Sequence, residues 1–167
     1  MTTANPFDAI ASSYDVDFTH SQIGRMQRRI VWEYLEKWLQ KTPDAKVLEL
    51  NCGTGADAQW LNSLGARVLA TDYAEEMVAQ TQAKLLDTDS EAKVLDLNAI
   101  EQMENEGPFD LIFSNFGGLN CLSPGELSAF AHKLPALLKP NGRFIAVVMP
   151  DFCAWETTYF LAKGKIK

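Results

Sequence analysis

The sequence alternates short apolar runs with segments of helical periodicity, and this alternation constrains the fold most strongly. Beyond Pro43, which breaks an earlier helical pattern, the runs are separated by helix candidates of roughly 10 to 15 residues. The predicted strands are Val47–Leu50, Arg67–Thr71, Lys93–Leu97, Phe109–Ser114 and Arg143–Met149. Such alternation is typical of parallel strands joined by right-handed crossovers. It predicts an α/β fold with an open, mostly parallel, twisted Rossmann-like sheet and helices on both faces.

Two helices are predicted before the first strand. Phe7, Ile10, Ala11 and Tyr14 follow the i, i+3, i+4, i+7 spacing of a short helix with one buried face. The apolar residues that repeat this spacing in a longer second helix are Ile23, Met26, Ile30, Tyr34, Leu35 and Trp38.

Composition and charge limit the partners. The 167 residues are 47% hydrophobic and 22% charged, which is typical of one globular domain. The formal net charge of −7 would repel a phosphate backbone, so we expect no nucleic-acid partner. No apolar run approaches the ~20 residues that span a bilayer, and the N-terminus lacks the pattern of a signal peptide. We expect a cytoplasmic protein without membrane contact.

The cysteines suggest no covalent or metal framework. Cys52, Cys121 and Cys153 form an odd set without Cys-x-x-Cys spacing. We therefore expect reduced thiols and no metal site.

The segment most informative for function is Val47–Asp57, a predicted strand that enters a glycine-rich turn and then a helix. Gly53 and Gly55 allow a ligand to approach the backbone and leave amide hydrogens directed at it. Asp72 follows at the end of the second predicted strand, where a carboxylate can hold the two hydroxyls of a ribose. The pattern indicates a nucleoside-containing cofactor.

Two cofactor classes compete for this motif. Gly53-x-Gly55-x-x-Ala58 also satisfies the loose pattern of dinucleotide-binding folds, so a nicotinamide-dependent oxidoreductase is an alternative. Glu49 at the strand end and Asp57 in the first helical turn would both oppose a pyrophosphate. They favour S-adenosylmethionine, which carries a sulfonium, an ammonium and one carboxylate.

Several segments, in this order, resemble the successive motifs of class I S-adenosylmethionine-dependent methyltransferases, most closely those acting on small molecules. They are Val47–Asp57, Val68–Met77, Asp96–Leu97, Phe109–Asn115 and Leu138–Gly142. The resemblance covers roughly residues 7–150. It implies a methyltransferase that moves a methyl group to a small-molecule acceptor by in-line displacement and releases S-adenosylhomocysteine.

The resemblance also implies individual roles around the cofactor. Gly53 and Gly55 would line the methionyl moiety, Glu49 would order its amino end, and Asp72 would take the ribose. The residues implied around the adenine are Tyr73 and Met77 as flanking side chains, Asp96 as acceptor from the exocyclic amine, and Leu97, whose amide would meet a ring nitrogen. The other implied cofactor-side residues are Tyr14, Asn51, Cys52 and Asn115.

Some of these residues also have a purely structural explanation. Asp72 could serve only as a helix N-cap, with Glu75 three residues later. Tyr14 could simply pack with its own helix, and a helical Met77 is often a core residue. Asn51 stands where the family's loop usually has its first glycine. Asparagine tolerates left-handed backbone geometry, so the turn should survive.

The loop after the fourth predicted strand should face the methyl acceptor, because open sheets bind ligands beyond the carboxyl ends of their strands. Phe116 and Asn120 are the substrate-side candidates, although Asn120 could equally stabilise the loop. No catalytic residue is assigned, because transfer from a sulfonium depends mainly on alignment and the exclusion of water. We expect His132 to face solvent.

The resemblance divides the chain into lid helices over residues 1–42, a cofactor-binding core over 43–150 and a C-terminal helical segment over 151–167. Relatives usually add two strands after the fifth, which are absent here, so we expect a shortened fold. The apolar edge at 143–149 predicts self-association. A non-catalytic S-adenosylmethionine-binding module is a further alternative.

Overall fold

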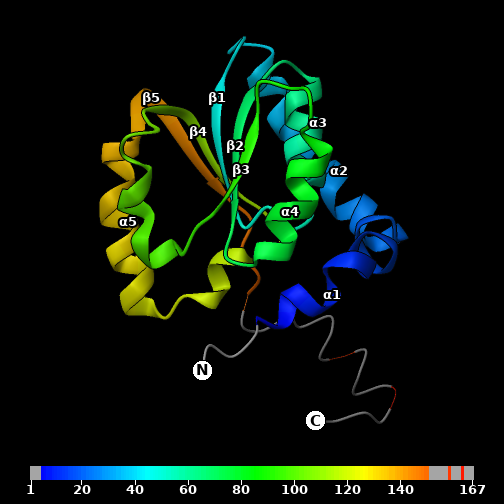
Figure 1. Ribbon diagram of the computed structural model, residues 1–167. Helices are drawn as coiled ribbons and strands as arrows, with labels where there is room; N and C mark the ends of the chain where they lie inside the picture. The colour runs from blue at the N-terminus through cyan, green and yellow to red at the C-terminus, as the bar shows by residue number, and fades with distance from the viewer. Residues whose placement is uncertain (1–4, 151–157, 159–162, 164–167) are drawn as a thin grey trace.

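The computed structural model describes residues 5–150, 158 and 163, and its centre is a parallel sheet between two helical layers (Figure 1). The strands are β1 (Lys46–Leu50), β2 (Arg67–Asp72), β3 (Glu91–Val94), β4 (Phe109–Ser114) and β5 (Leu138–Ala146), in the order β3-β2-β1-β4-β5. The helical elements are α1 (Pro6–Tyr14), η1 (Asp15–Thr19), α2 (Gln22–Leu39), α3 (Ala56–Ser63), α4 (Glu75–Lys84), η2 (Leu97–Met103), η3 (Gly118–Cys121) and α5 (Pro124–Leu137). The predicted α/β fold is confirmed.

The core lies on both faces of the sheet because the central strands are apolar on both sides. Helices α2, α3 and α4 cover one face, and η2 and α5 cover the other (Figure 1). Val47 of β1 belongs to the first cluster, and its neighbour Leu48 belongs to the second. Both are fully buried, as expected for a parallel sheet covered on both faces.

Local sequence fixes where several helices begin. The side chains of Asn5 and Ser21 accept hydrogen bonds from the first turns of α1 and α2. Ser123 and Glu126 form a reciprocal capping box at the start of α5. Helix α5 joins β4 to β5, and these two strands pair in parallel.

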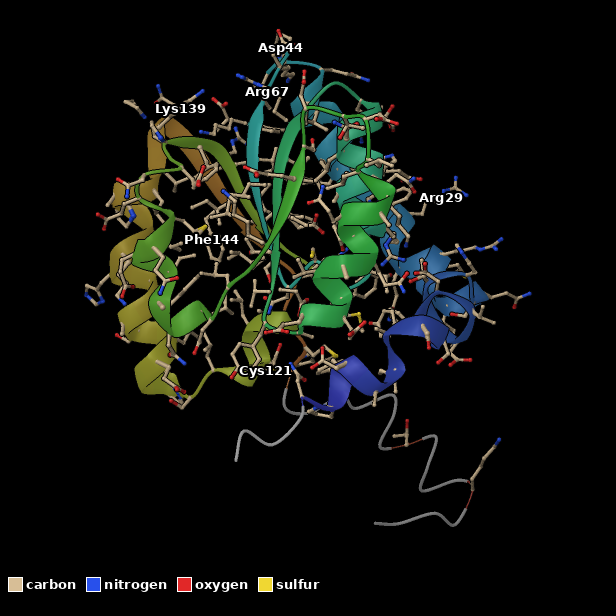
Figure 2. All side chains as sticks on the ribbon, in the orientation of Figure 1. Arg29, Asp44, Arg67, Cys121, Lys139 and Phe144 are labelled. Carbon is tan, nitrogen blue, oxygen red and sulfur yellow. The ribbon has the colours of Figure 1, made fainter. Side chains whose placement is uncertain are left out.

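The two ends of the sheet differ in what surrounds them. Figure 2 shows Asp44, Arg67 and Lys139 at the end where the strands start. Cys121 lies at the opposite end, near α1 (Figure 2). The strand order places a switch point between β1 and β4, whose following loops separate at this carboxyl end.

Helix α2 is present, but its predicted apolar face is buried only toward the C-terminal end, where Leu35 is in the core and Trp38 packs against it. Ile23, Met26, Ile30 and Tyr34 are 56–70% exposed. The face that packs inward carries Arg28, because this side chain forms an ion pair with a buried carboxylate on α3. In the first half of α2, an ionic contact to α3 therefore lies on the inward face in place of the predicted apolar residues.

Two strands differ from their predicted limits. Strand β3 ends at Val94 because the apolar residues that follow turn into η2. Strand β5 starts at Leu138, includes a register irregularity opposite Phe109–Leu111, and ends at Ala146 opposite Ser114. The predicted C-terminal helix lies outside the described residues. Within the part that is described, no helix is both long and apolar enough to cross a membrane.

Candidate functional site

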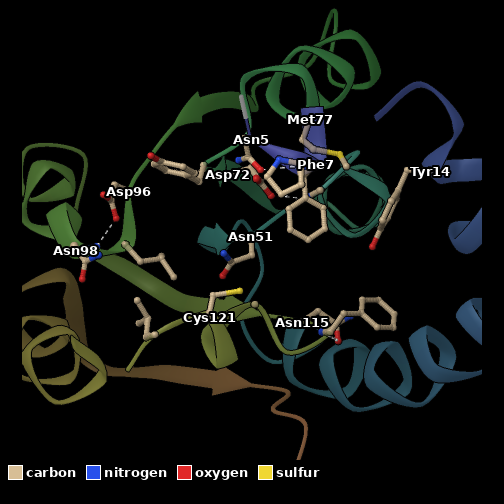
Figure 3. A pocket seen from close by; sticks show the side chains of 17 residues that line it. Asn5, Phe7, Tyr14, Asn51, Asp72, Met77, Asp96, Asn98, Asn115 and Cys121 are labelled. Atoms are coloured by element: carbon tan, nitrogen blue, oxygen red, sulfur yellow. Dashed lines mark hydrogen bonds between the residues drawn. The ribbon is translucent and has the colours of Figure 1, made fainter. Parts of the chain in front are cut away.

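A cavity of about 450 Å³ opens at the carboxyl ends of β1, β2 and β4. Its lining residues are Asn5, Pro6, Phe7, Tyr14, Asn51, Gly53, Asp72, Tyr73, Met77, Asp96, Leu97, Asn98, Asn115, Phe116, Gly118, Cys121 and Leu122. Figure 3 shows Tyr14 and Asp96 at opposite ends, with Asn51 and Asp72 between them. The cavity is elongated, and its volume lies in the range of small-molecule sites.

The glycine-rich turn forms one wall of the cavity. Asn51, Gly53 and Gly55 have φ angles of 56°, 55° and 80°, in the left-handed region. A Cβ at Gly55 would approach within 2.6 Å of Thr81, so this turn requires glycine for space as well as for backbone geometry. Thr81 of α4 also donates a hydrogen bond to the Gly53 carbonyl over 2.9 Å. The loop is thus held in one shape by the neighbouring helix.

Asn51 fits at a position where the family usually has glycine because the residue that faces its side chain, Gly118, has no side chain of its own. A Cβ at Gly118 would overlap the Asn51 side chain. Asn51 Oδ1 also accepts a hydrogen bond from the Ser114 hydroxyl over 3.3 Å. The expected survival of the turn is confirmed, and the space comes from the loop after β4.

Asp72 connects the turn to the start of α4. Its Oδ2 accepts from the Gly53 amide and its Oδ1 accepts from the Ala74 amide, each over 2.9 Å. The N-cap residue of α4 is Ala74, so Asp72 is not the cap itself. Burial raises the pKa of Asp72, although the backbone hydrogen bonds from Ala74 and Gly53 oppose this rise. Each carboxylate oxygen retains a lone pair for a further donor.

The far end of the cavity combines apolar and polar groups. Met77 is buried, whereas Tyr73 is 61% exposed at the cavity edge. Asp96 Oδ1 accepts from the Asn98 amide over 2.9 Å and thereby starts η2 (Figure 3). Its other carboxylate oxygen has no hydrogen-bond partner among the described residues. Together with Leu97, these groups suit a flat heterocycle with polar edges.

Asp57 lies outside the cavity lining and accepts hydrogen bonds from three side chains. Its Oδ1 accepts from Arg28 Nε over 2.9 Å and from Trp32 Nε1 over 2.6 Å. Its Oδ2 accepts from Asn115 Nδ2 over 3.0 Å. Asp57 is absent from the cavity lining, and the idea that its charge favours S-adenosylmethionine over a pyrophosphate stays a prediction. Asp57 instead positions Asn115, whose own oxygen accepts from the Phe116 amide.

Glu49 lies behind the cavity wall, and its side chain is only partly satisfied. It is 1% exposed, and its Oε2 has no hydrogen-bond partner among the described residues. Burial, and then the negative charge of Asp57, raise the pKa of Glu49 well above its usual value. A cationic group in the cavity would favour the ionised form of this carboxyl.

The N-terminal helices close one side of the cavity through aromatic contacts. The ring of Phe18 lies 5.5 Å from that of Tyr14 and 5.1 Å from that of Phe116. Asp15 fixes this segment to the core, because it accepts from Thr54 over 2.5 Å and from Lys84 over 2.6 Å. Burial raises the pKa of the Tyr14 hydroxyl, so Tyr14 remains neutral.

The structure brings most of the predicted site residues together, but not all of them. Glu49, Cys52, Gly55 and Asn120 are absent from the lining. Asn120 exchanges two hydrogen bonds with the backbone of Met149, which is the loop-stabilising alternative. The lining residues that were not named individually from the sequence are Asn5, Pro6, Phe7, Asn98, Gly118, Cys121 and Leu122. Gly118 lies in the loop predicted to face the acceptor, and Asn5, Pro6 and Phe7 lie in the segment predicted as a lid. Proximity to the motifs could have indicated Asn98, whereas no sequence signal indicated Cys121 and Leu122.

The histidines lie away from this cavity. His132 is exposed and its Nδ1 contacts the Ser128 carbonyl within its own helix, which confirms the solvent-facing position. His20 is also exposed and does not line the cavity.

Comparison with known proteins identifies the family. The sequence profile of a family described as "Methyltransferase domain" matches residues 47–142, more than half of the chain. The chain belongs to this methyltransferase family. The resemblance to class I methyltransferases is thereby confirmed, and the nicotinamide alternative has no support.

The relatives of this methyltransferase domain are longer proteins. A demethylmenaquinone methyltransferase of Mycolicibacterium gilvum is 30% identical over 85% of this chain and 58% of the relative. A malonyl-[acyl-carrier protein] O-methyltransferase of Bacillus cereus is 28% identical over 75% of this chain and 46% of the relative. The chain thus spans about half the length of these relatives.

A solved structure supports the same assignment. The structure titled "DhpI-SAH complex structure" is 26% identical and has a TM-score of 0.63, covering 84% of this chain and 65% of that chain. The overall fold of this chain is therefore similar to that of this solved structure.

Proposed function

We propose that this domain binds S-adenosylmethionine in the cavity and transfers its methyl group to a small-molecule acceptor. The observation that carries the proposal is the pairing of Asp72 with the glycine-rich turn. The two carboxylate oxygens each use one lone pair on a backbone amide and offer the other toward the cavity. This arrangement suits the two adjacent hydroxyls of a ribose.

The remaining residues fit the two ends of the same cofactor. Glu49, buried with an unpartnered oxygen, would balance the charge of the methionyl ammonium from behind the turn. Met77 and Tyr73 would flank the adenine, and Asp96 would accept from its exocyclic amine. When bound, S-adenosylmethionine supplies a methyl group already activated on a sulfonium.

The chain's own task is then to align an acceptor and exclude water. Phe116, Cys121 and Leu122 form a mainly apolar part of the lining beside the loop after β4. We propose that the acceptor is a small organic molecule that approaches along this side. The N-terminal helices would act as its lid, because Tyr14 and Phe7 cover the cavity opposite the sheet.

Thermal unfolding with added ligand tests the cofactor. A ligand at about 100 times its dissociation constant stabilises a protein by about 2.7 kcal/mol, a shift of about 5 to 10 °C for a domain of this size. We expect that shift with S-adenosylmethionine and S-adenosylhomocysteine, and its loss in Asp72→Ala. Asp89→Ala, which removes an exposed acid away from the cavity, is the matched control. Stabilisation by NAD alone would overturn the proposal.

Methyl transfer is tested separately with isotopically labelled S-adenosylmethionine. We expect label to enter a pool of small quinols, carboxylic acids or amines and not protein or nucleic acid. Labelling of a macromolecule in preference to every small-molecule pool would contradict the assignment of the acceptor class.

A further inference from the structure

A second cavity of about 510 Å³ lies between α2 and α3, with a lining of different chemical character. Its residues are Thr19, His20, Arg25, Arg28, Arg29, Trp32, Ala56, Gln59, Trp60 and Ser63. None of them lines the first cavity. An inference about this cavity therefore does not rest on the proposed cofactor site.

The charge of the second cavity opposes that of the whole chain. The chain carries a formal net charge of −7, yet this lining holds three arginines and a histidine and no carboxylate. Arg28 is paired with Asp57 and Arg29 with Glu33, whereas Arg25 forms no ion pair within the described part of the chain. A concave surface that gathers three guanidinium groups, one of them without a counter-ion, attracts anions.

Arg28 adds a donor that is already desolvated. It is 7% exposed, and its Nε is occupied by Asp57 over 2.9 Å. Its Nη1 is buried and lacks a hydrogen-bond partner among the described residues. Buried charged donors are usually satisfied, so this atom indicates a missing acceptor. Its guanidinium also packs over the Phe116 ring, at 4.7 Å from the ring centroid, which fixes its position.

The wall of the cavity also offers a flat aromatic surface. Trp32 and Trp60 are stacked with ring centroids 4.5 Å apart and an interplanar angle of 1°. Trp32 is held in place by its hydrogen bond to Asp57. A stacked pair that lines a cavity presents apolar area to a planar ligand at little entropic cost.

We propose that this second cavity binds a small aromatic anion, with a phosphate or carboxylate on the arginines and a ring against the tryptophans. Phosphate and carboxylate share the geometry that guanidinium groups recognise. The ring distinguishes this ligand from inorganic phosphate. The charge distinguishes it from neutral aromatic compounds.

Tryptophan fluorescence of the full chain tests the proposal directly, because two of its four tryptophans line the cavity. Phenyl phosphate and benzoate are titrated at constant ionic strength against inorganic phosphate and phenol. We expect saturable quenching by at least one ring anion, with binding at least tenfold tighter than that of inorganic phosphate and phenol. The stronger of phenyl phosphate and benzoate identifies the anionic group.

Variants locate the binding. Arg25→Gln with Arg29→Gln changes two exposed side chains and should weaken the ring anion at least tenfold, and Arg25→Gln alone should weaken it less. Trp60→Leu should abolish the preference over inorganic phosphate. Arg67→Gln, at the start of β2 and away from Arg29 (Figure 2), should leave binding unchanged. Absence of saturable quenching by either ring anion, or equal affinity in the double variant, would overturn the proposal.

Discussion

Asp57 and Asp72 lie on either side of the glycine-rich turn, and they differ in their hydrogen-bond partners. Asp72 is bonded to backbone amides at the cavity and keeps lone pairs free. Asp57 is bonded to the side chains of Arg28, Trp32 and Asn115 and does not line the cavity. Position in a motif therefore does not decide whether the oxygens of a carboxylate remain available to a ligand or are used within the fold. The hydrogen-bond donors around the carboxylate decide this.

The largest expected effect is the difference between Asp57→Ala and Asp72→Ala in the loss of unfolding free energy. Asp57→Ala leaves Arg28 buried without its counter-ion and should cost about 3–5 kcal/mol in the free energy of unfolding. Asp72→Ala leaves two amides beside a water-accessible cavity and should cost about 1–2 kcal/mol. Urea denaturation of both variants measures the difference, with Asp89→Ala as the control. Equal losses would show that the two carboxylates do not differ as their contacts indicate.

A smaller effect tests how the turn accommodates Asn51. Gly118→Ala would overlap the Asn51 side chain and should cost about 1–3 kcal/mol through overpacking. Asn51→Gly in the same chain should restore most of that loss, because it removes the obstructing atoms. The φ angle of Gly118 is not in the left-handed region, so the substitution isolates the steric conflict.

A double-mutant cycle in urea quantifies the coupling between these positions. Gly125→Ala is the matched control, since a Cβ there meets open space. Additive losses at positions 51 and 118 would mean that Asn51 is tolerated for another reason.

These contrasts show which parts of the site can be read from sequence. The turn, Asp72 and Asp96 follow strands at predictable spacing, so local pattern is sufficient to place them at one end of the sheet. The partnership of Arg28 with Asp57 joins segments 29 residues apart and depends on how α2 is rotated. The apolar spacing of α2 places Ile23, Met26 and Ile30 on the buried face, where the structure has Arg28 instead. The fit of Asn51 against Gly118 depends on two loops that meet only in the folded chain.

The last expected effect concerns pH and the buried carboxyl of Glu49. Burial raises the pKa of Glu49 in the folded chain above that of the unfolded chain, about 4.3. The protonated carboxyl therefore stabilises the fold below the unfolded pKa, and this contribution is lost as pH rises through the folded pKa. Glu49→Gln, which stays neutral, should be more stable than the wild type at pH 8, and the two unfolding free energies should converge toward about pH 4.

The same substitution should act in the opposite direction on cofactor binding. A methionyl ammonium favours ionised Glu49, so binding to the wild type should release a proton and strengthen as pH rises from about 5 to 8. Each unit by which the ligand lowers the pKa contributes up to about tenfold in affinity. Calorimetry at several pH values in this range gives the ratio of wild-type to Glu49→Gln affinity. Because the titrations of Asp72 and of the ligand affect both proteins, their contributions cancel in this ratio. A ratio that stays constant with pH would place the ammonium away from Glu49. A ratio that rises with pH, together with greater stability of Glu49→Gln, would show that this buried carboxyl binds a cation at the expense of stability.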